Sequence, residues 1–297
     1  MIKSLLLPFL IAISSAICFG QSRFDSVNIT HTILTEKLYM LEGSGGNMGL
    51  YVGENEVLLI DDQYGPLSEK IMQKVKDISG REVTRIINTH WHGDHTGGNE
   101  NFGKAGAMII AHENVRKRMS TEQVRGERVT PASPAVALPV ITYSEEMQLY
   151  FMGEPVLITH VHNGHTDGDS FIYFPESKVA HLGDCFFHKR FPYIDTGSGG
   201  SIDGMITAIE TAMMILDDDT QIIPGHGPMA TKEDLSNYLT FLKTVRERVF
   251  SYISNGRGQE SIDPAKIVEG YEDLAWGFID AERFTGIVYA SLTQANN

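Results

Sequence analysis

Four potential metal ligands lie within the six residues His90-Trp91-His92-Gly93-Asp94-His95. His90 and His92 are two residues apart, so their imidazoles point the same way in an extended or turn backbone, whereas they would diverge on a helix. Asp94 and His95 are adjacent and project in different directions. This loop could therefore feed two neighbouring ions. Imidazole and carboxylate together suit zinc, although iron, manganese and nickel accept similar ligand sets.

The hydrophobic pattern predicts that this loop follows a buried strand over residues 83–88. Upstream, short apolar segments predict an antiparallel meander, and Pro66 and Gly80 bound a predicted helix. Strands are expected at 37–41, 48–52, 56–60, 107–111, 156–161, 170–174, 178–182 and 221–223. Further helices are expected at 112–119, at 202–216 and from Thr231 onward. The polar, then proline-rich segment 120–139 is expected to be a long mobile loop. Strands followed by a helix occur twice, which suits two sheets packed between helical layers.

Composition limits the class of partner. The chain has 297 residues, 42% of them hydrophobic, and a formal charge of −14. No basic stripe is present that could release counterions from DNA or RNA, so a nucleic-acid partner is not expected. A small-molecule substrate is the expected partner, and the sequence specifies no oligomeric state.

The first twenty residues differ from the rest. Lys3 is their only charge, an apolar stretch covers residues 5–17, and Gly20 ends the segment. This pattern predicts a signal peptide over 1–20, cleaved near Gly20-Gln21, and a periplasmic or secreted protein with no stable membrane span after cleavage. An uncleaved anchor is the alternative, although the apolar run is short for a bilayer; lipidation at Cys18 is another. Cleavage would leave Cys185 alone, so no intramolecular disulfide is expected.

Three further candidate ligands follow predicted strands. They are His165 in Gly164-His165-Thr166-Asp167-Gly168, Asp184 in Gly183-Asp184, and His226 in Pro224-Gly225-His226-Gly227. Glycine lets the backbone turn sharply and approach an ion closely. A metal site needs ligands beyond the first loop, and these residues could supply them.

The order of these residues resembles the metallo-β-lactamase superfamily of binuclear hydrolases, over roughly residues 35–255. The resemblance implies an α+β fold, an αββα sandwich of two mixed sheets flanked by helices, with the site along one edge of the sheets. It assigns His90, His92 and His165 to the first ion, Asp94, His95 and His226 to the second, and Asp184 as the bridge. The hydrolase domain would cover 21–255, with a helical tail, 256–297, packed on the same domain.

The sequence departs from two branches of that family. Lactamases of the cysteine-containing branch use a Cys in the region of Asp184-Cys185 and do not normally have a counterpart of His95. The all-histidine branch generally lacks the bridging Asp. This chain has His95, Asp184 and Cys185 together, so it resembles the broader hydrolase group, with Cys185 as a substitute candidate ligand. Thioester hydrolases of the glyoxalase II type share the seven ligands, but the C-terminal tail shows no clear matching substrate domain. RNA-processing phosphodiesterases also share them, yet the leader and the acidity argue against that role.

Two divalent ions sharing a water would lower its pKa and leave a metal-bound hydroxide as nucleophile. We therefore expect two Zn²⁺ ions, with iron or manganese less favoured, and cleavage of an ester, lactone or β-lactam carbonyl. Asp94 is expected to accept a proton from that water besides binding metal. The alternatives are a true β-lactamase, an iron-dependent oxidoreductase on the same scaffold, and a metal-binding protein without turnover.

The loop after Asp184 carries candidate substrate-binding residues. His188, Lys189, Arg190 and Tyr193 could face the metals and anchor a substrate carboxylate, with a solvated surface loop as the alternative. The remaining histidines of the strands are expected to be structural; they are His112, His160, His162 and His181. Asp61 and Asp62 end a strand near the site and are candidate partners of a ligand histidine.

Overall fold

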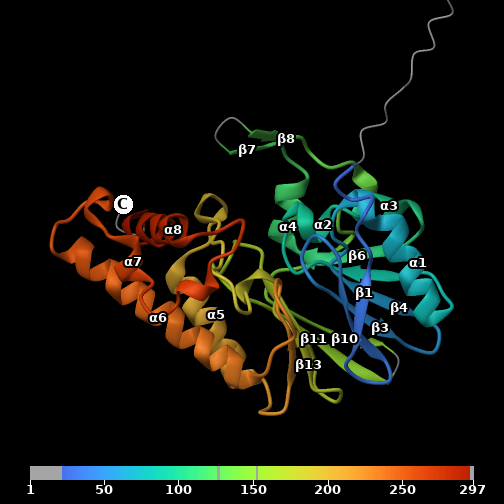
Figure 1. The fold of residues 1–297 in the computed structure, drawn as a ribbon. Coiled ribbons are helices and arrows are strands. Elements are labelled where there is room, and N and C mark those ends of the chain that lie inside the picture. Colours follow the sequence, from blue (N-terminus) through green and yellow to red (C-terminus); the bar gives the residue numbers. More distant parts are fainter. Residues whose placement is uncertain (1–21, 126–127, 152, 295–297) are drawn as a thin grey trace, which may run out of the picture.

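The computed structural model describes residues 22–125, 128–151 and 153–294, so the expected leader and its cleavage site lie outside the described residues. Two mixed sheets pack face to face, and helices cover the outer face of each (Figure 1). This is the αββα arrangement that the sequence predicts.

The first sheet contains seven strands in the order β1-β2-β3-β4-β5-β6-β9. Strands β2 to β4 form the predicted antiparallel meander, to which β1 adds a further antiparallel strand. Strands β4, β5, β6 and β9 are parallel, and neither β1 nor β9 was predicted from the sequence. The strands are β1 (Thr30–Ile33), β2 (Leu38–Glu42), β3 (Met48–Val52), β4 (Val57–Ile60), β5 (Arg85–Ile87), β6 (Met108–His112) and β9 (Ile141–Tyr143). The parallel pairing brings the carboxyl ends of β4, β5 and β6 to one edge, where the His-rich loop lies.

The second sheet contains five strands in the order β10-β11-β12-β13-β14. Its strands are β10 (Glu146–Phe151), β11 (Glu154–His160), β12 (Ser170–Phe174), β13 (Val179–His181) and β14 (Gln221–Ile223). Only β13 and β14 pair in parallel. The loops after β11, β13 and β14 carry the later candidate ligands.

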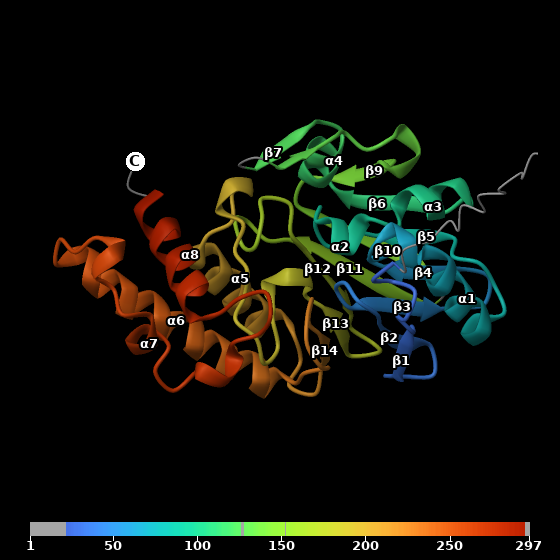
Figure 2. The same ribbon diagram turned by 45° about the horizontal axis from the view of Figure 1, so that its top comes forward.

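Apolar side chains from the two sheets meet in one shared layer, where for example Tyr51 of β3 stacks on Phe174 of β12 with ring centroids 5.4 Å apart. The outer face of the first sheet packs against α1 (Ser68–Ser79) and α3 (Asn99–Lys104). The outer face of the second sheet packs against α5 (Ile202–Ile215) and α6 (Lys232–Ser254), and α8 (Ala281–Gln294) packs on these two helices (Figure 2). Each sheet therefore buries both faces, which fixes the edge where the loops gather.

Local signals in the sequence account for the ends of two helices. Gly80 terminates α1 with φ of 70°, a left-handed conformation that glycine adopts without a steric penalty. The side chains of Thr231 and Asp234 form a reciprocal capping box at the start of α6, as predicted. No helix in the described part of the chain is long and apolar enough to cross a membrane.

One segment is more ordered than the sequence suggests, and the C-terminal tail is helical as expected. The expected long loop over 120–139 contains an antiparallel hairpin of β7 (Gln123–Arg125) and β8 (Arg128–Thr130), so the expectation of an unstructured loop was wrong there. Polar strands of three residues give no periodic signal. Beyond Asn255 the chain forms α7 (Pro264–Ile267) and α8, and Phe284 and Val288 of α8 are buried in the same core as α5 and α6.

Candidate metal centre and cleft

Strand β5 delivers the His-rich loop to the sheet edge. His92 has an extended backbone, with φ of −66° and ψ of 147°, and the short helix α2 (Gly93–Thr96) then carries Asp94 and His95. The change from extended to helical backbone sends the two pairs of ligands in different directions. This agrees with the prediction that one loop serves two positions.

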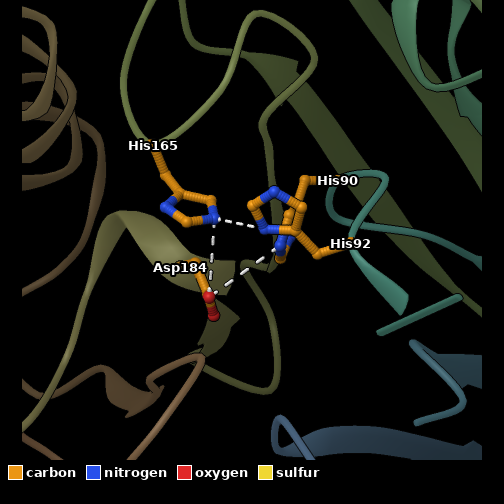
Figure 3. Close-up of side chains that lie close together, drawn as sticks. All are labelled: His90, His92, His165 and Asp184. Carbon is orange, nitrogen blue, oxygen red and sulfur yellow. Dashed lines mark hydrogen bonds and ion pairs between the residues drawn. The ribbon is translucent and has the colours of Figure 1, made fainter. Parts of the chain in front are cut away.

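The first group joins three histidines to one carboxylate. Ligand atoms of His90, His92, His165 and Asp184 all lie within 4.8 Å of one another. His165 Nε2 lies 2.8 Å from His92 Nδ1 and 3.6 Å from Asp184 Oδ2, and His90 Nε2 lies 3.8 Å from the same oxygen (Figure 3). The sequence separates these residues by up to 94 positions, but the fold brings them together.

The second group contains Asp94, His95 and His226. His226 Nε2 lies 3.3 Å from Asp94 Oδ2 and 3.5 Å from Asp184 Oδ2, while His95 Nε2 lies 3.0 Å from Asp184 Oδ1. The Asp184 carboxylate therefore faces both groups, which is the arrangement of a bridging ligand. All seven predicted ligands converge at one place.

A buried carboxylate orients two of the histidines from behind. Asp61 Oδ2 accepts hydrogen bonds from His95 Nδ1 and from Thr89 Oγ1, both at 2.7 Å, and Thr89 Oγ1 lies 3.0 Å from His90 Nδ1. These bonds leave Nε2 of each ring facing the site. A carboxylate behind a ligand histidine fixes its tautomer and increases its basicity.

Different acceptors hold the other two rings of the first group. Asp195 Oδ2 lies 2.9 Å from His92 Nε2, and the Tyr193 carbonyl lies 2.7 Å from His165 Nδ1. Asp195 is thus a functional residue that the sequence did not reveal. Its signal would have been a carboxylate in the loop after Asp184, which sequence order alone does not connect with His92.

Burial and neighbouring charges set the protonation of the site. Burial lowers the pKa of His90 and brings that of His92 to about 4, so both rings are neutral, as metal ligation requires. Burial acts against charge on Asp184 as well, but the imidazoles of His95 and His226 outweigh it and lower the pKa of the carboxyl. At His95 and His226 burial is outweighed by the carboxylate of Asp184, which raises the pKa of both rings, that of His226 to about 9. A divalent cation bound at the second group would therefore displace their protons.

The packing fits the binding of metal ions. His90 Nε2 is buried and makes no hydrogen bond, and an orphaned buried acceptor needs a partner such as a cation. Two glycines make room: a Cβ atom on Gly46 would overlap the His95 ring, and one on Gly225 would overlap the Asp184 carboxylate. The seven residues therefore fit two closely spaced divalent ions.

The structure places Cys185 outside both groups. Its thiol is buried against α5 and α6 and donates to Asp169 Oδ2 at 3.4 Å. Burial and the Asp169 carboxylate raise the pKa of the thiol well above its usual value, which disfavours the thiolate needed for ligation. Cys185 thus offers no ligand in this arrangement, contrary to the sequence-based suggestion.

The four candidate substrate residues divide into two pairs. His188 points away from the site, with Nδ1 2.9 Å from the Pro228 carbonyl and Nε2 3.5 Å from Asp234 Oδ1, and Lys189 is exposed outside the cleft. Arg190 and Tyr193 line the cleft above the metal centre. The suggestion of a substrate anchor on this loop therefore narrows to the second pair.

The metal centre opens into a cleft of about 740 Å³. Its floor includes His92, Asp94, Asp184 and His226. Its walls come from segments far apart in the chain; the wall residues include Glu42, Trp91, Thr130, Phe187, Arg190, Tyr193, Trp276 and Phe278. Trp276 and Phe278 of the tail were not predicted to reach the site.

With this geometry established, comparison with known proteins is informative. Residues 41–226, more than half of the chain, match the family model of the metallo-beta-lactamase superfamily. The chain belongs to this superfamily. A metallo-beta-lactamase from Pontibacter korlensis has the same fold, with a TM-score of 0.61 at 17% identity over 73% of this chain and 99% of that one.

Two curated relatives of this superfamily member are hydrolases by name. A hydroxyacylglutathione hydrolase of Erythrobacter litoralis is 33% identical over 109 residues, 36% of each chain. A probable metallo-hydrolase of Bacillus subtilis is 24% identical over 65% of this chain and 92% of its own length. The match thus spans about a third of the first relative and nearly all of the second.

Proposed function

We propose that this protein is an exported, zinc-dependent hydrolase that cleaves an ester, lactone or β-lactam carbonyl. The observation that carries the proposal is the convergence of seven ligand side chains in two groups, with Asp184 facing both, at the floor of a cleft of about 740 Å³. Two divalent ions bound there would supply Lewis acidity and a water nucleophile active at neutral pH. The names of the curated relatives agree with hydrolysis.

The side chains around the site have different proposed roles. Asp94 is part of the cleft floor, and its Oδ2 faces His226, so it is placed to accept a proton from the attacking water. His90, His92 and His165 hold their positions through bonds to their outer nitrogens, which keeps the site rigid during turnover. Arg190 and Tyr193 contact the part of the substrate that does not react.

Zinc is the proposed metal because five imidazoles and two carboxylates make a nitrogen-rich site of borderline softness. Hard cations such as Mg²⁺ prefer all-oxygen sites. Export is proposed from residues 1–20, whose single charge and apolar stretch are typical of a cleaved leader. Expression of the full chain in a bacterial host, followed by cell fractionation and mass determination of the mature N-terminus, tests export; a cytoplasmic chain that retains residue 1 contradicts it.

One experiment tests the metal and the reaction together. Purified protein is assayed for metals by elemental analysis, and initial rates are then measured on nitrocefin, a lactone, a thioester, an aryl ester and a phosphodiester. We expect two zinc ions per chain, turnover of at least one carbonyl substrate, and loss of turnover on chelation that zinc restores. Background rates on all carbonyl substrates with fully zinc-loaded protein would contradict the proposal. Turnover of the phosphodiester alone would also contradict it and would identify the protein as a phosphodiesterase.

A further inference from the structure

The C-terminal tail forms one wall of the cleft, although the family match ends at His226. Trp276 and Phe278 lie between the short 3₁₀ turn Glu272–Leu274 and α8, and they line the cleft with Arg190 and Tyr193. We call these four residues the tail wall. The wall therefore combines two residues outside the matched region, Trp276 and Phe278, with two residues inside it from the loop after Asp184.

Hydrogen bonds fix the tail wall in place. Trp276 and Ile279 exchange backbone bonds of 3.0 and 3.1 Å, and Trp276 Nε1 donates to the Phe191 carbonyl at 2.9 Å. Arg283 Nη1 donates to the Phe278 carbonyl at 2.7 Å, and its guanidinium lies 4.1 Å from the centroid of the Phe278 ring. The rings are therefore presented in a preorganised position, which reduces the entropy lost when a ligand binds.

Arg190 is the one arginine or lysine of the described cleft lining, and it is not paired with a carboxylate. Arg118 binds Asp167 through two bonds of 2.6 Å, and Arg246 binds Asp203 at 2.9 Å. Arg190 has no carboxylate within 4.0 Å among the described residues, in a chain with 38 acidic and 24 basic side chains. Its guanidinium instead lies 4.9 Å from the centroid of the Trp276 ring. A stacked guanidinium keeps its N–H edge available to an anion.

The position of Trp276 connects this surface with the chemistry. Its ring centroid is 6.0 Å from that of His226, a ligand of the second group, and the Phe187 ring lies against both, 5.1 Å from His226 and 6.4 Å from Trp276. A ring bound against Trp276 therefore lies beside the metal centre. Glu42 is the one acidic side chain of the described cleft lining outside the ligand set, so a cationic substrate is the competing alternative.

We propose that the tail wall selects substrates that carry an aromatic ring and a carboxylate: the ring packs on Trp276 and Phe278, and the carboxylate binds the N–H edge of Arg190. This rests on the proposed function in taking the cleft as the substrate site, and it specifies the substrate class of that site. Arginine binds carboxylates through two parallel hydrogen bonds, and aromatic side chains favour flat apolar groups.

Equilibrium binding of small probes tests the proposal without turnover. The dissociation constants of phenylacetate, 2-phenylacetamide, cyclohexylacetate and acetate are measured by calorimetry on the protein as purified. We expect phenylacetate to bind about tenfold more tightly than each of the other three, because each lacks the charge, the flat ring or the whole ring. Equal affinity for phenylacetate and its uncharged amide, or for phenylacetate and acetate, overturns the proposal.

Variants separate the tail wall from direct binding of the carboxylate to metal. Arg190→Gln is expected to remove the preference for phenylacetate over the amide and to leave the affinity for the amide unchanged. Trp276→Leu is expected to weaken both phenyl probes about tenfold, whereas Trp276→Phe retains their binding. Unchanged phenylacetate affinity in Arg190→Gln means that the carboxylate binds elsewhere, which contradicts the proposal.

A matched pair on α6 provides the control. Arg246 lies 5.0 Å from the centroid of the Phe250 ring, away from the cleft lining, so Arg246→Gln and Phe250→Leu repeat the same chemical changes at a distance. Neither should alter any dissociation constant, and thermal melts verify that all variants fold. Because these measurements require no reaction, they can succeed when every hydrolysis assay fails, and the hydrolysis assays can succeed when the probes show no preference.

Discussion

The structure contains two kinds of buried histidine. The rings of His90, His95 and His165 each anchor one nitrogen and direct the other toward Asp184. His112 and His160 are also buried, and each anchors a nitrogen on a backbone carbonyl, at 2.9 and 2.8 Å. Their rings, however, stack on each other at 3.8 Å and converge on no pair of carboxylates.

The difference teaches that burial and anchoring do not distinguish a metal ligand from a structural histidine. His181 makes the point again, because it is buried while its two nitrogens bind the Asn47 carbonyl and the Gly183 amide, at 3.1 Å each. Neither ring nitrogen of His181 is therefore available to a metal ion. What marks the ligand set is the convergence of several ring nitrogens on the carboxylates of Asp94 and Asp184.

The largest effect is expected from Asp94→Asn. The amide cannot accept the proton that we assign to Asp94, so turnover should fall by about 10² to 10⁴, the usual contribution of a general base. Initial rates are measured together with bound zinc. Asp218→Asn, at a side chain that is 99% exposed, is the matched control and should behave as the wild type. Undiminished turnover in a fully metallated Asp94→Asn protein would remove Asp94 from the mechanism.

Asp61→Asn tests whether the anchoring of the ligand histidines matters for metal binding, and its expected effect is smaller than that of Asp94→Asn. Asp61 has φ of 60°, which asparagine tolerates, so the change removes charge from behind His95 and Thr89 without new backbone strain. Metal affinity should fall by about 10- to 100-fold. Competition with a chelator measures it, with Asp218→Asn again as control. Wild-type affinity would show that the anchoring of His95 does not matter for binding.

The stacked pair His112 and His160 should contribute to pH dependence without affecting the metal. Burial lowers the pKa of both rings in the folded state, whereas the unfolded chain protonates near pH 6.5. The unfolded state therefore binds protons first, so this contribution to stability is complete above about pH 6.5 and is lost as the pH falls further.

Urea unfolding between pH 7.5 and 5 measures this loss. His160→Gln should reduce the slope of unfolding free energy against pH by up to about 1.4 kcal/mol per pH unit, the limit for one proton. His31→Gln is the control, because His31 is exposed and its ring packs on Tyr39 rather than on the stacked pair. An identical slope in wild type and His160→Gln would show that the pair binds protons alike in both states.

The ligand set could be predicted because the order of these residues resembles that of the metallo-β-lactamase superfamily, and each ligand lies in a short glycine-containing loop after a strand. Gly225 shows why the loop sequence is so restricted: any side chain there would overlap Asp184. The pairing of His92 with Asp195 and of His95 with Asp61 depends on how the fold brings distant segments together. The spacing of residues along a single chain does not contain this information, although the position of Asp61 at a strand end made it a candidate.

The fold, like the site, was predictable only in those parts that leave a local signal in the sequence. Apolar strands and the capping box of Thr231 and Asp234 leave periodic or positional signals, whereas the polar hairpin β7–β8 and the cleft wall do not. Trp276, for example, reaches the cleft because α8, the helix that follows it, packs on the core through the buried side chains of Phe284 and Val288. A contact set by distant helices cannot be inferred from local sequence.

The smallest effect is expected at Cys185, and it bears directly on which residues belong to the ligand set. The protonated thiol is buried and bonded to Asp169, so iodoacetamide should not modify it in the protein as purified or after chelation, but should do so in urea. Peptide mass mapping locates the modification. Cys185→Ala should retain its full zinc content, with a stability change of about 1 kcal/mol. Alkylation that appears only after chelation would instead show that metal protects the thiol, and would bring Cys185 into the ligand set beside Asp184.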